Sequence, residues 1–329
     1  MMEARSAEMA AGSAESCRRE FLNQEPRDGR ATVSAVMTSF NKRNDVAKNL
    51  DGLRRQTVRF DEIIVVDNRS SDGTQAMIRE KYPEVTFIAM HHSGYGACET
   101  FNIGFGTASG DYVAILDDDV VLPPEWVELM LAKFASEPET TGVISSRVRE
   151  PEMPDWYWND PSVATERYMS TFRGCASLVR RDVLERAGYY DDRFFIYGNE
   201  RDLSCRILNE GFRILQYPDV IVDHGTPFGM KKSPRSLYYH VRNLWLYLFK
   251  NVSWWNIFKL FVGVFLKPFK RKKATTDAVG TIGFFGTVRG TKRGLWICFK
   301  ATCAAFWNLP YCLKRRRVCK HPDFRLPLQ

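Results

Sequence analysis

The feature that most constrains the fold of this chain is a regular alternation of short apolar runs and segments with helical spacing, which begins at residue 32. The apolar runs have the length of buried strands, and the segments between them repeat apolar residues every three or four positions. The expected strands are 32–38, 62–67, 85–90 and a run that reaches residue 116, and the expected helices are 45–56, 75–81 and about 97–109. Alternating units of this length predict an α/β fold with a mostly parallel sheet covered by helices on both faces.

Three consecutive carboxylates, Asp117, Asp118 and Asp119, follow the apolar run Ala114-Ile115-Leu116. Carboxylates crowded at the end of a buried strand repel one another, so we expect a cation nearby. Side chains two apart on a strand share a face, which lets Asp117 and Asp119 converge while Asp118 points away. Convergent carboxylates suit a hard divalent ion, Mg²⁺ or Mn²⁺. A solvated acidic turn is the alternative interpretation.

Polar side chains also end the other expected strands. In open α/β sheets, ligands bind beyond the carboxyl ends of the strands. The residues expected at these ends are Ser39, Asn41, Asp67, Asn68, Asp117 and Asp119. Their shared placement predicts a single binding site along this edge of the sheet.

Four motifs together resemble the nucleotide-sugar-binding half of family 2 glycosyltransferases. They are Thr38-Ser39-Phe40-Asn41, Val65-Val66-Asp67-Asn68-x-Ser70-x-Asp72-Gly73-Thr74, Asn102-x-Gly104 and Leu116-Asp117-Asp118-Asp119. The resemblance covers about residues 31–243. It implies a GT-A fold in which an Asp-x-Asp segment and Mn²⁺ or Mg²⁺ hold a nucleoside diphosphate sugar, here expected to be linked to UDP or dTDP.

The same resemblance implies roles for individual residues. Asp67 would contact the base or ribose of the donor, Asp117 would lie near the ribose and the metal, and Asp119 would bind the metal. The residues expected to bind the donor are Thr38, Ser39, Asn41, Asp67, Asn68, Asn102, Asp117 and Asp118.

The second half of the resemblance concerns the acceptor. Relatives carry Glu-Asp-x-Asp-Leu after an aromatic-Gly stretch, with the second acid as general base. In this chain the matching run is Asn199-Glu200-Arg201-Asp202-Leu203, so a glutamate, Glu200, occupies the position of the base. Asp202 is the alternative base, or caps the helix that runs to residue 210. One base and one displacement imply inversion at the anomeric carbon.

A histidine ends the expected strand 214–222, in Asp223-His224-Gly225. A single histidine has a structural role more often than a metal-binding one. Galactofuranosyl- and rhamnosyltransferase-like members of the family, however, place a histidine here, and this implies that His224 is the third protein ligand beside Asp117 and Asp119. Imidazole suits Mn²⁺ better than Mg²⁺.

The C-terminal third has a strongly basic composition. From Gly225 onward, 21 Lys and Arg residues stand against Asp277 and Asp323, a net charge of +19. An apolar, Trp-containing helix is expected over 254–266, before the basic run 267–273, and another over 294–313. The first is too short to span a bilayer, and Lys300 and Pro310 interrupt the second, so both fit an anionic membrane surface. The alternative is that they cover the sheet domain.

These observations lead to a division of the chain and an expected function. We expect a disordered segment 1–30, a catalytic domain 31–230 with a nucleotide-sugar half (31–120) and an acceptor half (121–230), and a helical, basic extension 231–329. Eight cysteines without a C-x-x-C pair indicate reduced thiols and therefore a cytoplasmic protein. The basic extension with its apolar helices indicates that this protein is peripheral on the inner face of the membrane.

The expected reaction is metal-dependent, inverting transfer of a sugar to a hydroxyl of a glycan or lipid-linked acceptor. The resemblance alone favours rhamnose or galactofuranose. A non-catalytic sugar-nucleotide-binding scaffold is one alternative. An NAD-dependent dehydrogenase, suggested by Gly94-x-Gly96, is a weaker one because Glu99 occupies the third glycine position. We do not expect a nucleic-acid partner, since the carboxylate constellation would have no role in such a protein.

Overall fold

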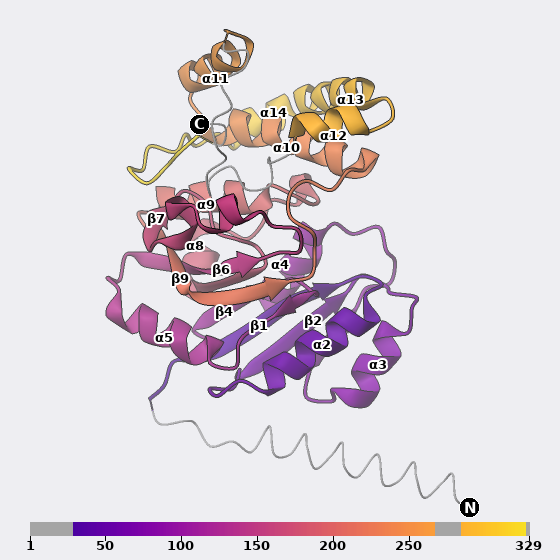
Figure 1. Cartoon of the computed structure of the whole chain (residues 1–329), viewed down its shortest axis with the longest axis vertical. Helices are drawn as coiled ribbons and strands as arrows, with labels where there is room; N and C mark the ends of the chain where they lie inside the picture. The colour runs from indigo at the N-terminus through magenta and orange to yellow at the C-terminus, as the bar shows by residue number, and fades with distance from the viewer. Residues whose placement is uncertain (1–28, 267–283, 327–329) are drawn as a thin grey trace, which may run out of the picture.

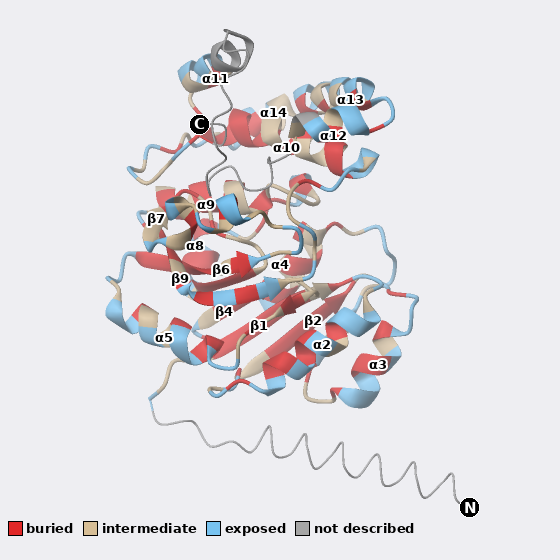
Figure 2. Cartoon of the chain, viewed as in Figure 1, coloured by how far each residue is buried: buried red, intermediate tan, exposed pale blue. Residues whose placement is uncertain are grey.

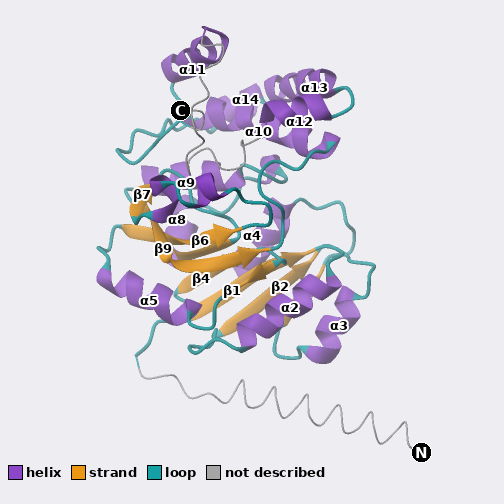
Figure 3. Ribbon diagram, viewed as in Figure 1, coloured by secondary structure: helices purple, strands orange, loops and turns teal. Residues whose placement is uncertain are grey.

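A computed structural model describes residues 29–266 and 284–326. The expected disordered segment 1–30 lies outside the described residues except for its last two positions, and the basic run 267–273 also lies outside them. Within the described part the chain forms a central sheet between layers of helices, with a further group of helices at one end (Figures 1 and 3).

The centre of the molecule is a nine-stranded sheet with the order β3-β2-β1-β4-β8-β6-β9-β5, in which β7 pairs with β9. In chain order the strands are β1 (Val33–Ser39), β2 (Glu62–Asp67), β3 (Thr86–Ala89), β4 (Tyr112–Leu116), β5 (Val120–Val121), β6 (Thr141–Arg149), β7 (Arg167–Met169), β8 (Ala176–Arg180) and β9 (Arg213–His224). The first four strands are mutually parallel, as expected. The remainder is mixed, because β8 runs antiparallel to β4 and β6, and β9 is antiparallel to β5 and β7.

Helices cover both faces of the sheet. The helices are α2 (Arg43–Arg54), α3 (Thr74–Lys81), α4 (Ala97–Thr107), α5 (Trp126–Ser136), α6 (Asp155–Trp158), α7 (Pro161–Ala164), α8 (Arg181–Ala187), α9 (Asn199–Asn209), α10 (Pro234–Asn251), α11 (Trp254–Leu266), α12 (Phe284–Gly290), α13 (Gly294–Trp307) and α14 (Leu309–Lys314), with a 3₁₀ turn, η1, at Asp192–Phe194. One core lies between the sheet and α2, α3 and α5, and the other between the sheet and α4, α8 and α9. The α/β class is therefore confirmed.

The strands alternate their side chains between these two cores. Val36 and Ile64 pack toward α4, whereas Met37 and Val65 pack toward α2 and α3. All four are completely buried, so these strands appear in the sequence as continuous apolar runs (Figure 2). Burial on both faces leaves only the ends of the strands available for polar chemistry.

The C-terminal helices gather at the end of the molecule away from α2 and α3 (Figure 1). Helix α10 packs its Leu246 and Tyr247 into the same core as Leu203 of α9. The Asn243 amide of α10 donates to the carbonyls of Phe194, Ile196 and Tyr197 at 2.7–2.9 Å. Helix α10 is thus part of the catalytic domain's packing. Among the described residues, no helix combines the length and the apolarity needed to cross a membrane.

Candidate active site

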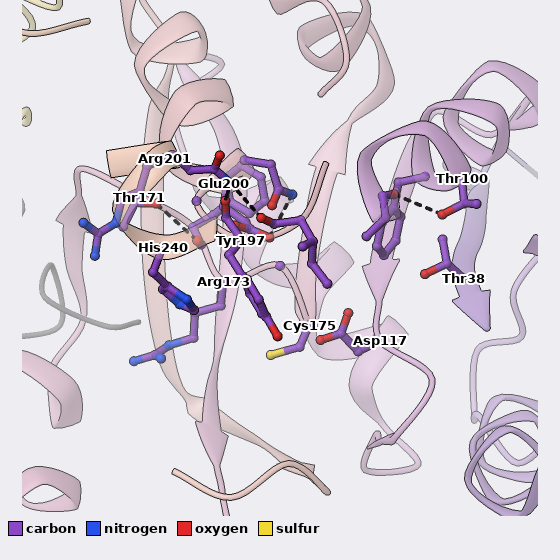
Figure 4. A pocket seen from close by; sticks show the side chains of 18 of the residues that line it. Thr38, Thr100, Asp117, Thr171, Arg173, Cys175, Tyr197, Glu200, Arg201 and His240 are labelled. Atoms are coloured by element: carbon purple, nitrogen blue, oxygen red, sulfur yellow. Dashed lines mark hydrogen bonds between the residues drawn. The ribbon is translucent and has the colours of Figure 1, made fainter. Parts of the chain in front are cut away.

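A cavity of about 450 Å³ lies at the carboxyl ends of β1 and β4, with α9 and α10 on its other side (Figure 4). Strand ends contribute Thr38, Ser39 and Asp117 to its lining, and the two helices contribute Glu200 and His240 among others. The cavity therefore lies where the strand-end residues predicted a site.

Asp117, Asp119 and His224 converge at one end of this site. The antiparallel pairing of β5 with β9 sets Val120 opposite His224, and this brings Asp119 alongside the histidine. His224 Nε2 lies 3.1 Å from Asp119 Oδ1 and 3.5 Å from Asp117 Oδ2. One ligand atom from each residue lies within 4.8 Å of the other two. The expected set of three metal-binding residues is therefore brought together by the fold.

The donor set fits a six-coordinate divalent ion. Neighbouring ligands at 2.0–2.2 Å from an octahedral ion are separated by roughly 3 Å, close to the 3.1 and 3.5 Å separations found here. Glu150 Oε1 lies 3.0 Å from His224 Nδ1 and accepts a hydrogen bond from it. The other ring nitrogen, Nε2, is thereby directed at the two aspartates. A carboxylate behind a ligating histidine is typical of metal sites.

The electrostatics of His224 point the same way. Burial lowers the pKa of His224, but Cys175 and hydrogen bonds to Asp117, Asp119 and Glu150 raise it, so that the net pKa lies well above its usual value. The surrounding carboxylates thus favour the protonated form of His224. Asp117, Asp119 and His224 would hold a divalent ion in place of that proton.

Lys42 supplies the cation that the three aspartates require. Its Nζ lies 3.0 Å from Asp118 Oδ1 and 2.8 Å from Asp119 Oδ2. Burial raises the pKa of Asp118 to about 6 despite Lys42, whereas hydrogen bonds from His224 and Lys42 hold that of Asp119 below its usual range against burial. Thr226 Oγ1 also donates to Asp119 Oδ2 at 2.9 Å. Asp118 and Asp119 thus share one cation, and Asp118 lines the cavity together with Asp117. The expectation that Asp118 points away from the other two is not met, because residues 117–119 form a turn between β4 and β5 and do not continue the strand.

Glu200 lines the cavity from the first turn of α9, which begins after Gly198 in a left-handed conformation (φ 74°). Burial, followed by the charge of Asp117, raises the pKa of Glu200 to about 7 against hydrogen bonds from its own backbone and from Asn199. A Cβ on Gly174 would lie 2.5 Å from Glu200 Oε1, so a larger residue there would displace the carboxylate from its present position. A carboxylate with a pKa near neutrality is suited to general base catalysis.

Asp202, the alternative base, lies outside the cavity in a buried ion-pair network. Its Oδ1 is 2.7 Å from Lys250 Nζ and its Oδ2 is 3.1 Å from Arg206 Nε. The same Nζ lies 2.5 Å from Asp191 Oδ2. Nor does Asp202 cap α9, which begins three residues earlier at Asn199. Between the two carboxylates the geometry favours Glu200, because Asp202 is committed to joining α9 to α10.

The expected donor-binding residues separate into two groups. Those that line the cavity are Thr38, Ser39, Asn68, Asp117 and Asp118. Asp67, Asn41 and Asn102 do not line it. Asp67 is completely buried, and its carboxylate accepts from Ser39 Oγ, from the Ser70 amide and hydroxyl, and from Gln75 Nε2. It organises the loop after β2, and a direct contact with the donor base stays a prediction.

Asn41 and Asn102 also hold backbone segments in place. Asn41, at φ 54°, accepts from the Ser71 amide at 2.8 Å. The side chain of Asn102 bonds to both the amide and the carbonyl of Tyr190, at 2.8 Å each, which ties α4 to the segment before η1. Asn41 and Asn102 therefore bond to the backbone of neighbouring segments and do not line the cavity, where donor contacts were expected.

Sequence reasoning missed Lys42, Glu150 and the α10 residues of the cavity. Glu150 directly follows β6, so a carboxylate at a strand end was a signal that could have found it. The pairing of β6 with β9 sets Arg149 opposite Asp223, and so places Glu150 beside His224. Lys42 and α10 had no comparable signal, because loop and helix packing bring them to the site.

Comparison with known proteins identifies the class. The model described as Glycosyl transferase family 2 matches residues 34–233, which is more than half of the chain. The chain therefore belongs to glycosyl transferase family 2 and is a glycosyltransferase. The dehydrogenase interpretation of Gly94-x-Gly96 gives way to this assignment. A Cβ on Gly96 would lie 2.5 Å from the Phe195 carbonyl oxygen, so this glycine serves close packing.

Individual relatives are distant. Protein CgeD of Bacillus subtilis is 28% identical over 180 residues, and the match spans 49% of this chain but only 42% of CgeD. The N-acetylglucosaminyl-diphospho-decaprenol L-rhamnosyltransferase of Mycobacterium tuberculosis is 23% identical over 68% of this chain and 86% of its own length. The mannosyltransferase PcManGT of Pyrobaculum calidifontis, solved with GDP-Man and Mn²⁺, has a TM-score of 0.52 at 18% identity over 93% of this chain and 81% of its own. This likeness confirms the GT-A fold.

Proposed function

We propose that the protein transfers a sugar from a nucleoside diphosphate sugar, linked to UDP or dTDP, to an acceptor hydroxyl with inversion, and that it requires Mn²⁺ or Mg²⁺. One observation carries the proposal: Asp117 forms a cluster with Asp119 and His224 and also lines the cavity that Glu200 lines, whereas Asp119 and His224 lie behind it. The fold and the family support a nucleotide-sugar donor, since PcManGT was solved with GDP-Man and Mn²⁺.

The residues of the chain would divide the work as follows. Asp117, Asp119 and His224 would hold the ion, which stabilises the negative charge on the departing diphosphate. Glu150 orients His224, and Lys42 holds Asp118 and the second oxygen of Asp119.

On the other side of the cavity, Glu200 would take the proton of the acceptor hydroxyl as it attacks the anomeric carbon. With a pKa of about 7, a substantial fraction of Glu200 is ionised at neutral pH. General base catalysis of this kind contributes ~10²–10⁴ in rate.

We further propose that the acceptor is a glycan or a lipid-linked compound and that the protein is cytoplasmic and binds an anionic membrane surface. The support is a set of exposed apolar side chains on α11 and α13, two helices at the end of the molecule (Figure 1). The residues of this aromatic face are Trp254, Trp255, Phe258, Leu295, Trp296, Phe299, Phe306 and Trp307, all more than half exposed except Phe306 at 50%.

The charge around the aromatic face suits anionic lipids. Between residues 284 and 322 the chain has nine Lys and Arg residues and no acidic residue. On α13, the exposed residues at 296, 299, 303 and 307 recur at helical spacing and so lie along one side of the helix. Apolar side chains flanked by cations are the features of helices that lie in the membrane interface.

The proposed donor and metal can be tested by thermal unfolding of the full chain with UDP, dTDP, GDP or NAD, each with and without Mn²⁺. We expect UDP or dTDP to raise the melting temperature only when Mn²⁺ is present. Stabilisation by GDP and not by UDP or dTDP would change the proposed donor to a GDP-linked sugar. Equal stabilisation with and without Mn²⁺ would contradict metal dependence. A donor panel against lipid-linked acceptors then measures turnover. Binding without turnover for any donor would favour the non-catalytic scaffold.

A further inference from the structure

Arginines gather on the wall of the cavity that faces the carboxylates. Arg201 follows Glu200 on α9 and Arg235 lies in the first turn of α10; both line the cavity. Arg173, in the loop before β8, lines the cavity too, but it interacts with Tyr157 and lies near Glu150, the partner of His224. In Figure 4, Arg201 lies on the opposite side from Thr38 and Asp117. The cavity therefore has an acidic wall and a basic wall.

The basic wall is built of more than one element. Arg235 sits over the ring of Phe195 at 5.6 Å, and the rings of Tyr197 and His240 stack at 4.4 Å. Within the described residues, Arg235 has no carboxylate within 4.0 Å. Guanidinium groups without a carboxylate partner at a partly apolar wall are suited to an anionic ligand, which they bind through two parallel hydrogen bonds.

The position of Glu200 indicates which substrate this anion belongs to. In an inverting displacement the acceptor approaches from the side opposite the leaving diphosphate, and the base lies beside the acceptor hydroxyl. The leaving diphosphate belongs at the acidic wall with the metal ligands. Glu200 and Tyr197 lie between the two walls in Figure 4, so the basic wall is on the acceptor side of the base.

We infer that the acceptor carries a phosphate or diphosphate group and that Arg201 and Arg235 bind it. This inference rests on the proposed function, because the anion is assigned to the acceptor only if Glu200 is the general base. The chemistry recognised is a phosphate close to the reacting hydroxyl, whether it is part of a lipid diphosphate or of a soluble phosphorylated sugar. Helix α10 carries Arg235 on the cavity side and packs against α13 of the aromatic face through Val241 and Ala301, which places a membrane-held lipid diphosphate within reach of the site.

The test is calorimetric binding of soluble probes to the full chain in EDTA, so that the donor metal site cannot contribute. The probes are geranyl diphosphate, geraniol, inorganic diphosphate and glucose 1-phosphate. We expect geranyl diphosphate to bind and geraniol not to bind. Arg201→Gln and Arg235→Gln should each weaken binding by about ten-fold or more. Arg79→Gln, an exposed arginine of α3 outside the cavity lining, is the matched control and should leave it unchanged.

The remaining outcomes decide the source of the phosphate and the fate of the inference. Stronger binding of geranyl diphosphate than of the soluble phosphates identifies a lipid diphosphate, and equal binding identifies a phosphorylated glycan. Binding that requires Mn²⁺, disappears in Asp119→Asn and survives both arginine variants would overturn the inference, as would equal binding of geraniol. If the probes bind in EDTA as expected but no donor sugar is transferred in the turnover assay, the anion-binding site is supported and the proposed function is wrong.

Discussion

The two walls of the cavity are built in different ways. The acidic wall consists of residues that end parallel or neighbouring strands, so each carboxylate is placed by the strand that precedes it. The basic wall consists of the first turns of two helices, α9 and α10, which are placed by packing between segments more than 30 residues apart. Chemistry at strand ends can be inferred from short motifs, whereas chemistry at a helix interface depends on which faces meet.

Glu200 and Asp202 show this difference within a single turn of α9. Two residues apart, they point to different sides of the helix. One lines the cavity with its pKa raised to about 7, whereas the pKa of the other is lowered against burial by Arg206 and Lys250. The same residue chemistry therefore faces the cavity on one side, where we propose a catalytic role, and joins two helices on the other. The variants below test that division, beginning with the largest expected effect.

The acidic wall is tested by Asp119→Asn, which alters one of the three side chains proposed to hold the metal and one ion-pair partner of Lys42. We expect transfer to fall by about a thousand-fold or more, since a metal ion contributes several kcal/mol of charge stabilisation. Mn²⁺ affinity, measured by calorimetry, should fall with it. Asp219→Asn, an exposed aspartate on the same strand as His224, is the control. Full activity of Asp119→Asn would show that a metal ion at this site is not needed for transfer.

The base is tested by Glu200→Gln. We expect turnover to fall by ~10²–10⁴ while Mn²⁺-dependent nucleotide stabilisation is kept. In the unaltered enzyme, the ionised form of Glu200 is lost as pH falls through about 7, so kcat/KM should decrease about ten-fold per pH unit below that value. The variant should lack this acid limb. Near-normal turnover of Glu200→Gln would mean that the base is another group.

The structural role of Asp202 is tested through Lys250, which is 3% exposed and contacts both Asp191 and Asp202. Lys250→Met leaves two buried carboxylates without their shared cation, and the free energy of unfolding should fall by about 3–5 kcal/mol in urea titrations. Adding Asp202→Asn should recover part of this loss. A fall below 1 kcal/mol would show that the network does not hold α10 to α9.

The smallest effect concerns the aromatic face. Trp296→Ala with Trp307→Ala should weaken binding to vesicles containing anionic lipid by roughly ten-fold, because both side chains are more than half exposed. Trp156→Ala, an exposed tryptophan of α6 in the catalytic domain, is the matched control. Unchanged vesicle binding by the double variant would exclude this face.

Point substitutions test membrane binding by the aromatic face more selectively than a truncation after Asn251 would. The amides of Arg317 and Cys319 donate to the carbonyls of Lys250 and Asn251 at 2.9 and 2.8 Å, so the C-terminal segment holds the end of α10. Removing it would disturb the basic wall together with the aromatic face. The result would not separate membrane binding from folding.

Much of the fold and of the acidic wall could be predicted from the sequence. The first four strands and three helices lie within two residues of their expected bounds, because burial on both faces leaves continuous apolar runs. The positions of Asp117 and Asp119 at a strand end were read from the sequence, whereas the family resemblance alone implied His224 as their partner; that the three bind a metal stays a prediction. The resemblance also placed Asn102 at the donor, but its side chain faces Tyr190 across a contact that links segments 88 residues apart.

The sequence by itself determined the alternation of strands and helices and the position of each carboxylate at a strand end, since both follow from local periodicity. The tertiary structure decided which of two acids in α9 meets the cavity, that Lys42 closes the acidic run, and that α10 forms the basic wall. Each of these depends on side chains that meet across long stretches of chain. Helical and strand periods set the direction of a side chain within its own element, but only packing between elements determines what it faces.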